Sequence, residues 1–261
     1  MIQARTFEDN VQQNNLTGSG RSARWSWVVA ILFALVPVVF TAAGSAAAQI
    51  LQLSDVLSTL AIAAAAVLSA VVGLAVMARS KQRLTNFGLR RPTGLRGVVW
   101  LLPAAATIVI ATATQAAGFD WTRWLAYGAL VIAVALNEEF WFRGLILTAL
   151  RAHGTAAAVY GSAGLFGVLH LANLAGGEDM ASSMLQLVFA VVFGIAAAQL
   201  TILTRSLWPA ITWHVLWNFV NLLSGNGPTP IALMGVAGSV AVIIGYIVAL
   251  RRRIRYLGQS S

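Results

Sequence analysis

Two adjacent carboxylates lie in a stretch of chain that is otherwise apolar. Glu138 and Glu139 fall within residues 125–150, where the other charged or amide side chains are Asn137 and Arg143. A charge at the centre of a bilayer costs at least ~2.5–3.5 kcal/mol on insertion scales, and such residues usually face a bundle interior or a wet cavity. Because the whole chain has only eight acidic residues, this neighbouring pair indicates a functional site.

The spacing gives the two glutamates different surroundings. Glu139 precedes Arg143 by four residues, so the two side chains share a helix face and can form an ion pair. Taken alone, such a pair has a purely structural explanation. Glu138 is turned by about 100° around the helix axis, and it is left free to point into a cavity.

Further polar side chains occur in two later apolar stretches. His170 follows Phe166 by one helical turn, and His214 and Asn218 are four residues apart, so each pair projects from one helix face. A single intramembrane histidine usually bonds a neighbouring helix, and Phe166 alone suits a core position. The remaining histidine, His153, is expected in a solvated turn.

These groups are predicted to meet at one depth. A tight turn at residues 151–154 pairs Glu138 with residue 167 across a hairpin, and His170 is then ~4.5 Å further along the axis. His214 lies ~10 Å and Asn218 ~16 Å from the start of their helix. We therefore expect one pocket in the inner half of the membrane, reached by water from the cytoplasm.

A carboxylate, two imidazoles and an amide suit hydrolysis of an amide bond. Glu138 can act as general base on a water, His170 can hold that water, and Asn218 can donate to the developing oxyanion. Glu138, His170 and His214 also form a ligand set for a catalytic zinc with an open fourth position. A metal-free water activated by glutamate is the alternative. Ser162 lacks the surrounding spacing of a serine intramembrane protease.

The composition indicates a membrane protein. Of the 261 residues, 59% are hydrophobic and 10% are charged, whereas a soluble domain carries roughly a quarter charged residues. There is no cysteine, which excludes disulfides and thiolate metal sites. A spanning helix needs about 20 apolar residues, so the sequence predicts an all-α, polytopic bundle of about eight transmembrane helices: 26–48, 55–78, 98–118, 124–150, 155–175, 183–204, 207–223 and 231–250.

The basic residues predict the orientation. If the N-terminus is inside, 15 of the 17 basic residues fall in inner segments, Arg123 alone is outside and Arg143 lies within a span. This bias predicts a multi-pass cell-membrane protein with both termini cytoplasmic. It also explains the net charge of +9 without a nucleic-acid partner. The lipid bilayer is the expected surrounding, and the loop 79–96 either fixes topology only or also binds anionic lipid heads.

The chain divides into four parts on this basis. Residues 1–24 are predicted to be a mobile cytoplasmic tail. Residues 25–118 hold three helices and the basic loop 79–97. Residues 120–224 hold the four helices with the polar groups, and residues 231–261 form the last span and a basic C-terminal tail.

Three short motifs resemble those of the CPBP family, the CAAX-protease and bacteriocin-processing intramembrane proteases. Residues 138–144, EEFWFRG, resemble the family motif EExxxRG. Residues 166–170, FGVLH, resemble FxxxH, and residues 214–218, HVLWN, resemble HxxxN. Residues 87–92, FGLRRP, are similar to an upstream segment of the family, and the resemblance covers residues 120–224.

The resemblance implies an eight-helix intramembrane endopeptidase that acts on membrane-associated proteins or peptides. Its relatives cleave prenylated CAAX proteins in eukaryotes, and bacterial members are linked to bacteriocin maturation or self-immunity. A metal is often assumed for the family, but a metal-free mechanism is also argued. The resemblance implies roles for seven residues: Glu138 as base with His170 as its partner, His214 and Asn218 completing the site, and Glu139, Arg143 and Phe166 as structural support.

Two other functions remain open from the sequence. A non-enzymatic immunity or scaffold protein could use the same fold, although such a protein would not need Glu138, His170, His214 and Asn218 together. A proton-coupled transporter could use the same groups as a relay. Against a transporter, no pair of Gly- or Pro-broken spans appears in matching halves of the chain.

Overall fold

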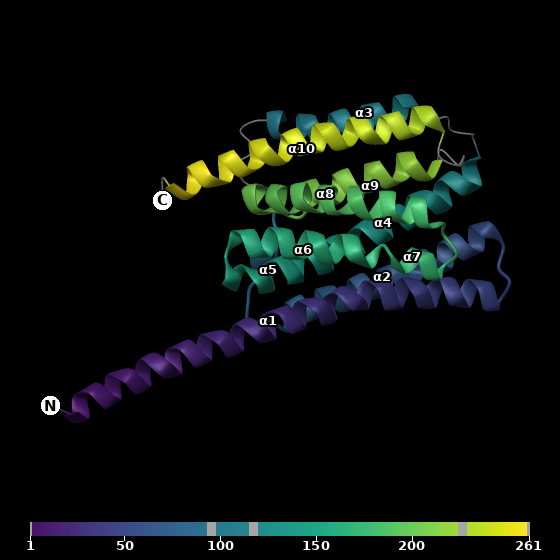
Figure 1. Ribbon diagram of the computed structural model, residues 1–261. Helices are drawn as coiled ribbons and strands as arrows, with labels where there is room; N and C mark the ends of the chain where they lie inside the picture. The colour runs from purple at the N-terminus through teal and green to yellow at the C-terminus, as the bar shows by residue number, and fades with distance from the viewer. Residues whose placement is uncertain (1, 93–97, 115–119, 224–228, 260–261) are drawn as a thin grey trace.

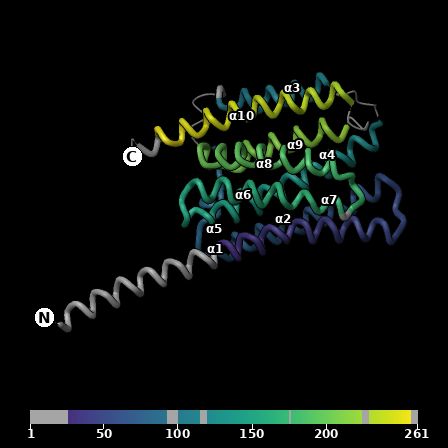
Figure 2. Tube along the Cα trace, viewed as in Figure 1, coloured from purple at the N-terminus to yellow at the C-terminus, as the bar shows by residue number. Residues whose placement is uncertain are grey.

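The computed structural model of the chain is a helix bundle (Figures 1 and 2). It describes residues 2–92, 98–114, 120–223 and 229–259, and within the helices the side chains of 2–25, 98–99, 175 and 257–259 are not described. No strand occurs in this part of the chain, so the predicted all-α fold class is confirmed. The predicted mobile tail, 1–24, lies outside the residues whose side chains are described.

Helices occupy all eight predicted intervals. Four segments are short 3-10 or π helices: η1 (Leu84–Phe87), η2 (Val98–Leu101), the π-helix η3 (Phe140–Ile146) and η4 (Arg151–His153). The α-helices are α1 (Ile2–Ile50), α2 (Asp55–Arg79), α3 (Leu102–Thr114), α4 (Trp121–Glu139), α5 (Leu147–Leu150), α6 (Thr155–Leu169), α7 (Ala172–Ala175), α8 (Met180–Thr204), α9 (Trp208–Leu223) and α10 (Pro230–Gln259).

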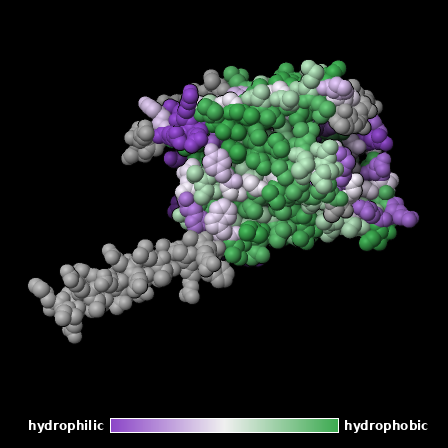
Figure 3. Space-filling view, in the orientation of Figure 1, coloured by the Kyte–Doolittle hydropathy of each residue, from purple (hydrophilic) through white to green (hydrophobic). Residues whose placement is uncertain are grey.

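Five segments of the described chain are long and apolar enough to cross a membrane, by length and composition: Ser26–Ile50, Asp55–Arg79, Thr155–Leu174, Met180–Thr204 and Pro230–Tyr256. The other three predicted spans do not meet that measure: α3 is a shorter apolar helix, α9 has 16 residues, and α4 continues through η3 into α5. Figure 3 shows an apolar band between two hydrophilic ends of the molecule. The chain is a multi-pass membrane protein.

The helices pack so that η3 and the last turns of α4 lie inside the bundle. α1 packs on α2, α2 on α4, α4 on α9, and α6 on α8, while α10 packs on α3 and α8 (Figure 1). Both termini lie at the same end of the bundle, and α7 lies at the opposite end. Small residues allow the close approach that helix packing in lipid requires, as at Gly194 of α8, where an added Cβ would lie 3.1 Å from Ala163.

Hydrogen bonds of two tryptophans tie the N-terminal helices to the centre of the bundle. The indole Nε1 of Trp141 donates to Ser69 Oγ on α2 at 3.1 Å, and that of Trp213 donates to Thr107 Oγ1 on α3 at 3.0 Å. Both indoles are buried, and because polar groups buried in lipid need internal partners, these bonds fix how α2 meets η3 and how α3 meets α9.

The histidine at the end of η4 differs in part from its prediction. The ring of His153 stacks on Trp27 of α1, with centroids 6.2 Å apart. Its Nε2 is buried and has no hydrogen-bond partner among the described residues. Arg151 and Ala152 of this turn are exposed and His153 is half-buried, so the turn is solvated as predicted, but one face of the histidine is covered by the first span.

At the other end of the bundle, acidic side chains begin two of the helices. Asp120 accepts hydrogen bonds from the backbone of Thr122 and Arg123, and Asp179 accepts from the backbone of Ala181 and Ser182. Such caps satisfy backbone N–H groups that have no partner within the helix. Hydrogen bonds from Ser182 hold the pKa of Asp179 below its ordinary value, and the cap is therefore ionised at neutral pH.

Candidate active site

The central helix changes its winding inside the first motif. Residues Phe140–Ile146 form a π-helix, and all seven are buried. The carbonyl of Phe142 accepts the backbone N–H of Leu147, five residues on, and the hydroxyl of Ser162 at 2.8 Å. π-Turns within α-helices frequently occur at functional sites, and the sequence analysis assumed regular α-helical winding here.

Glu139 and Arg143 form the ion pair that their spacing predicts. Arg143 Nη1 lies 3.0 Å from Glu139 Oε1, and both side chains are fully buried. The guanidinium carbon also lies 4.1 Å from the ring centroid of Phe166, which adds a cation–π contact. Gly194 leaves room for this arginine, since a Cβ there would come 3.2 Å from Nη2.

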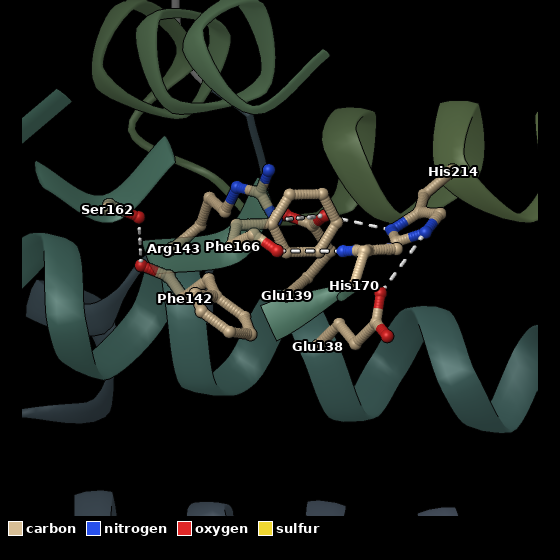
Figure 4. Close-up of polar contacts among 8 residues, drawn as sticks. All are labelled: Glu138, Glu139, Phe142, Arg143, Ser162, Phe166, His170 and His214. Atoms are coloured by element: carbon tan, nitrogen blue, oxygen red, sulfur yellow. Dashed lines mark hydrogen bonds and ion pairs between the residues drawn. The ribbon is translucent and has the colours of Figure 1, made fainter. Parts of the chain in front are cut away.

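His214 lies between the two glutamates (Figure 4). Its Nδ1 is 3.0 Å from Glu139 Oε1, and its Nε2 is 3.5 Å from Glu138 Oε2. An ionised carboxylate only accepts hydrogen bonds, so the proton on Nδ1 is donated to Glu139. The other ring nitrogen, Nε2, faces the Glu138 carboxylate, and the sequence does not predict this bridging position.

His170 is oriented in the same way by the backbone. It stands at the C-terminal end of α6, and its Nδ1 lies 2.7 Å from the carbonyl oxygen of Phe166. A carbonyl only accepts, so Nδ1 carries the hydrogen and Nε2 keeps its lone pair. The Phe166 ring packs edge-on against His170, at 4.7 Å, and against His214, at 6.0 Å. Phe166 therefore positions both imidazoles, as well as Arg143.

The predicted convergence is observed. Glu138, His170, His214 and Asn218 all line one cavity of about 210 Å³. A smaller cavity of about 80 Å³ adjoins it, shares both histidines and Asn218, and reaches Trp217. The sequence thus identifies the residues that meet at this centre, although they come from three separate helical segments.

The cavity also has walls that the sequence analysis missed. α1 contributes Pro37, Val38 and Thr41, and the amides of Asn173 and Gln186 line the opposite side. Asn173 Nδ2 donates to Gln186 Oε1 at 2.7 Å, which joins the start of α7 to α8. Pro37 is the proline inside α1, and a proline within an apolar helix was the available signal. On α8, Phe193 packs 5.1 Å from His214, with no motif to mark it.

The exposed residues of the cavity lie at the end of the bundle opposite to the one that the sequence predicts. Ala172 and Asn173 are exposed, line the cavity, and belong to α7, at the end of the bundle away from the termini (Figure 1). The sequence predicts access from the end that carries the termini. A count of residues from the hairpin turn gives the register of the two helices. It does not show that the chain forms the short helix α7 directly after His170.

The predicted zinc ligands meet only in part. Glu138 Oε2 and His214 Nε2, 3.5 Å apart, have a separation that two ligands of one tetrahedral ion could adopt. In the described part of the chain, however, no group of three His, Cys, Asp or Glu side chains is arranged to hold an ion. His170 therefore does not complete the ligand set in this arrangement.

A membrane-embedded helix bundle that gathers a carboxylate, two imidazoles and an amide around one cavity has the features of an intramembrane hydrolase. Residues 120–220 match the family model described as type II CAAX prenyl endopeptidase Rce1-like. The match confirms the resemblance to the CPBP family, and at the family level it implies an intramembrane endopeptidase. No curated protein and no solved structure matches the chain. All the predicted site residues fall inside the matched segment.

Proposed function

We propose that this protein hydrolyses peptide bonds of membrane-associated substrates, with Glu138 as the general base. The observation that carries the proposal is the position of the Glu138 carboxylate. It lies on the wall of the cavity, 3.5 Å from Nε2 of His214. The other nitrogen of that ring, Nδ1, is held by the buried carboxylate of Glu139. Glu138 is the carboxylate of the pair that keeps some exposure, with 20% of its side chain accessible.

In the proposed reaction, Glu138 takes a proton from a water in the cavity as that water attacks the peptide carbonyl. The same carboxyl then gives the proton to the departing amine, so the base is regenerated. His170 and His214 present Nε2 lone pairs to the cavity and can accept hydrogen bonds from the water. Because Nδ1 of each ring is already bonded, the rings need no reorientation during the step.

Asn218 is the proposed oxyanion donor. It lines the same cavity, one turn beyond His214 on α9. An amide N–H that points to the developing negative charge stabilises the tetrahedral intermediate, and loss of one such donor typically costs about 10²–10³ in kcat.

The cavity favours a short, extended segment as substrate. Its volume is about 210 Å³, far smaller than a folded domain, so the reacting groups contact only a short segment of a substrate. The amides of Asn173 and Gln186, at the exposed side, offer the donors and acceptors that an extended peptide backbone requires. We propose lipid-anchored or bacteriocin-related proteins and peptides as the substrate class.

A comparison of membrane proteomes tests the proposal. Cells that carry wild-type protein, Glu138→Gln or the control Glu178→Gln, which alters an exposed carboxylate outside the cavity, are analysed for new peptide termini. We expect termini that appear with wild type and with the control and that are absent with Glu138→Gln. Identical termini in all three strains, at equal protein levels, would favour the non-enzymatic scaffold instead.

A further inference from the structure

A second cavity lies at the end of the bundle that carries the termini. Its volume is about 360 Å³, against about 210 Å³ for the candidate active site. It lies between the start of α6, the last turns of α8 and the C-terminal part of α10, and its lining includes Thr155, Val159, Tyr160, Gln199, Arg251 and Arg255. None of these residues belongs to the candidate active site.

The positive charge of this cavity comes from two sources. Arg251 and Arg255 are four residues apart on α10, so both guanidinium groups project to the same side. α6 also begins at the cavity: Thr155 and Ala156 line it, and the preceding Gly154 provides no side-chain cap. The free N–H groups and the helix dipole at such a start attract anions. No carboxylate is among the residues that line the cavity.

A buried amide gives independent support for a ligand. Gln199 is 4% exposed and lines the cavity, and its Oε1 has no hydrogen-bond partner among the described residues. Buried polar atoms are rarely left without a partner. Tyr160 and the apolar Val159 and Ile254 also line it, so the cavity combines polar residues with apolar surface.

We propose that this cavity binds a phosphate group, that of an anionic phospholipid at the membrane surface. Two arginines and a helix start match the oxygens of a phosphate diester. Gln199 Oε1 can accept from a headgroup hydroxyl, and the apolar wall suits the first carbons of the acyl chains. The site lies where the apolar run of α10 gives way to the arginines that begin at Arg251, a change typical of the depth at which headgroups lie.

Lipid-dependent thermal stability of the full-length protein in detergent tests the proposal. Wild type is compared with Arg251→Gln/Arg255→Gln and with the control Arg252→Gln/Arg253→Gln, which removes the same charge from exposed neighbours that do not line the cavity. Phosphatidylglycerol should raise the melting temperature of wild type and of the control. In the Arg251/Arg255 variant, its apparent affinity should be roughly 10- to 30-fold weaker.

Two further titrations separate the sources of the phosphate. Phosphatidylcholine with the same acyl chains should give a smaller shift, and inorganic phosphate alone should give none. If inorganic phosphate raised the melting temperature of wild type but not of the Arg251/Arg255 variant, the same site would belong to a soluble phosphate ligand. Equal phosphatidylglycerol affinity in the two double variants, or an equal response to phosphatidylcholine, would overturn the proposal.

Discussion

The imidazole of His214 is held by Glu139, whose Oε1 lies 3.0 Å from Nδ1. The same oxygen accepts from Arg143 at 3.0 Å, so one buried carboxylate fixes both the arginine and the histidine. Glu139 thus supports the site twice: it neutralises a buried guanidinium, and it sets the tautomer in which Nε2 of His214 faces Glu138.

Replacement of Glu139 should destabilise the protein. In Glu139→Ala, Arg143 remains fully buried without its counter-charge, and removal of one partner from a buried pair costs about 3–5 kcal/mol. We expect a clearly lower melting temperature in detergent and loss of activity. Glu178→Ala, an exposed carboxylate, is the control and should melt like wild type. A Glu139→Ala protein as stable as wild type would contradict the bracing role.

Glu138→Gln should separate function from folding. The amide keeps the size of the side chain, and the contact with His214 is long, at 3.5 Å, so the melting temperature should stay near that of wild type. Loss of a general base typically lowers the rate by about 10²–10⁴-fold. The measurement is cleavage of a substrate that the proteome comparison identifies. Full activity of this variant would refute the assignment of Glu138 as the base.

Ser162 is expected to serve structure rather than catalysis. Its hydroxyl donates to the Phe142 carbonyl within the π-helix and is fully buried. Ser162→Ala should cost about 1 kcal/mol of stability and retain cleavage activity. Complete inactivity together with an unchanged melting temperature would instead favour a serine nucleophile.

The question of zinc has a direct test. Because Glu138 Oε2 and His214 Nε2 are 3.5 Å apart and His170 does not join them as a third ligand, we expect no stoichiometric zinc in the purified protein. Elemental analysis measures the metal, and chelator treatment measures whether activity depends on it. About one equivalent of zinc, lost together with activity in His170→Ala, would establish a metal site.

Thiol labelling tests the access route in this cysteine-free chain. Ala172 is exposed and lines the cavity, whereas Ala210 is fully buried, so a membrane-impermeant reagent should modify Ala172→Cys and leave Ala210→Cys unmodified. With the predicted cytoplasmic termini, α7 faces outside, and labelling should occur in intact cells. Modification of Ala172→Cys in inverted vesicles only would reverse the orientation.

The sequence predicted the parts of the site that depend on spacing along one helix. The Glu139–Arg143 pair and the shared cavity of Glu138, His170, His214 and Asn218 follow from periodicity and a hairpin register. The bond from His214 to Glu139 could not be predicted, because it depends on how α9 rotates against α4. The π-helix that begins at Phe140 was missed for a similar reason: one of its carbonyls, that of Phe142, accepts a hydrogen bond from Ser162, a residue 20 positions away.

α1 forms one wall of the cavity through Pro37, Val38 and Thr41, and it lies outside the segment that matches the family model. Substitutions at these three positions would reshape the space around a bound peptide while the reacting groups kept their places. The residues that catalyse the reaction and the residues that select the substrate thus lie in different parts of the sequence. Homologues with identical motifs can differ in substrate selectivity through their first span alone. Exchanging that span between them offers a way to change which substrate is cleaved.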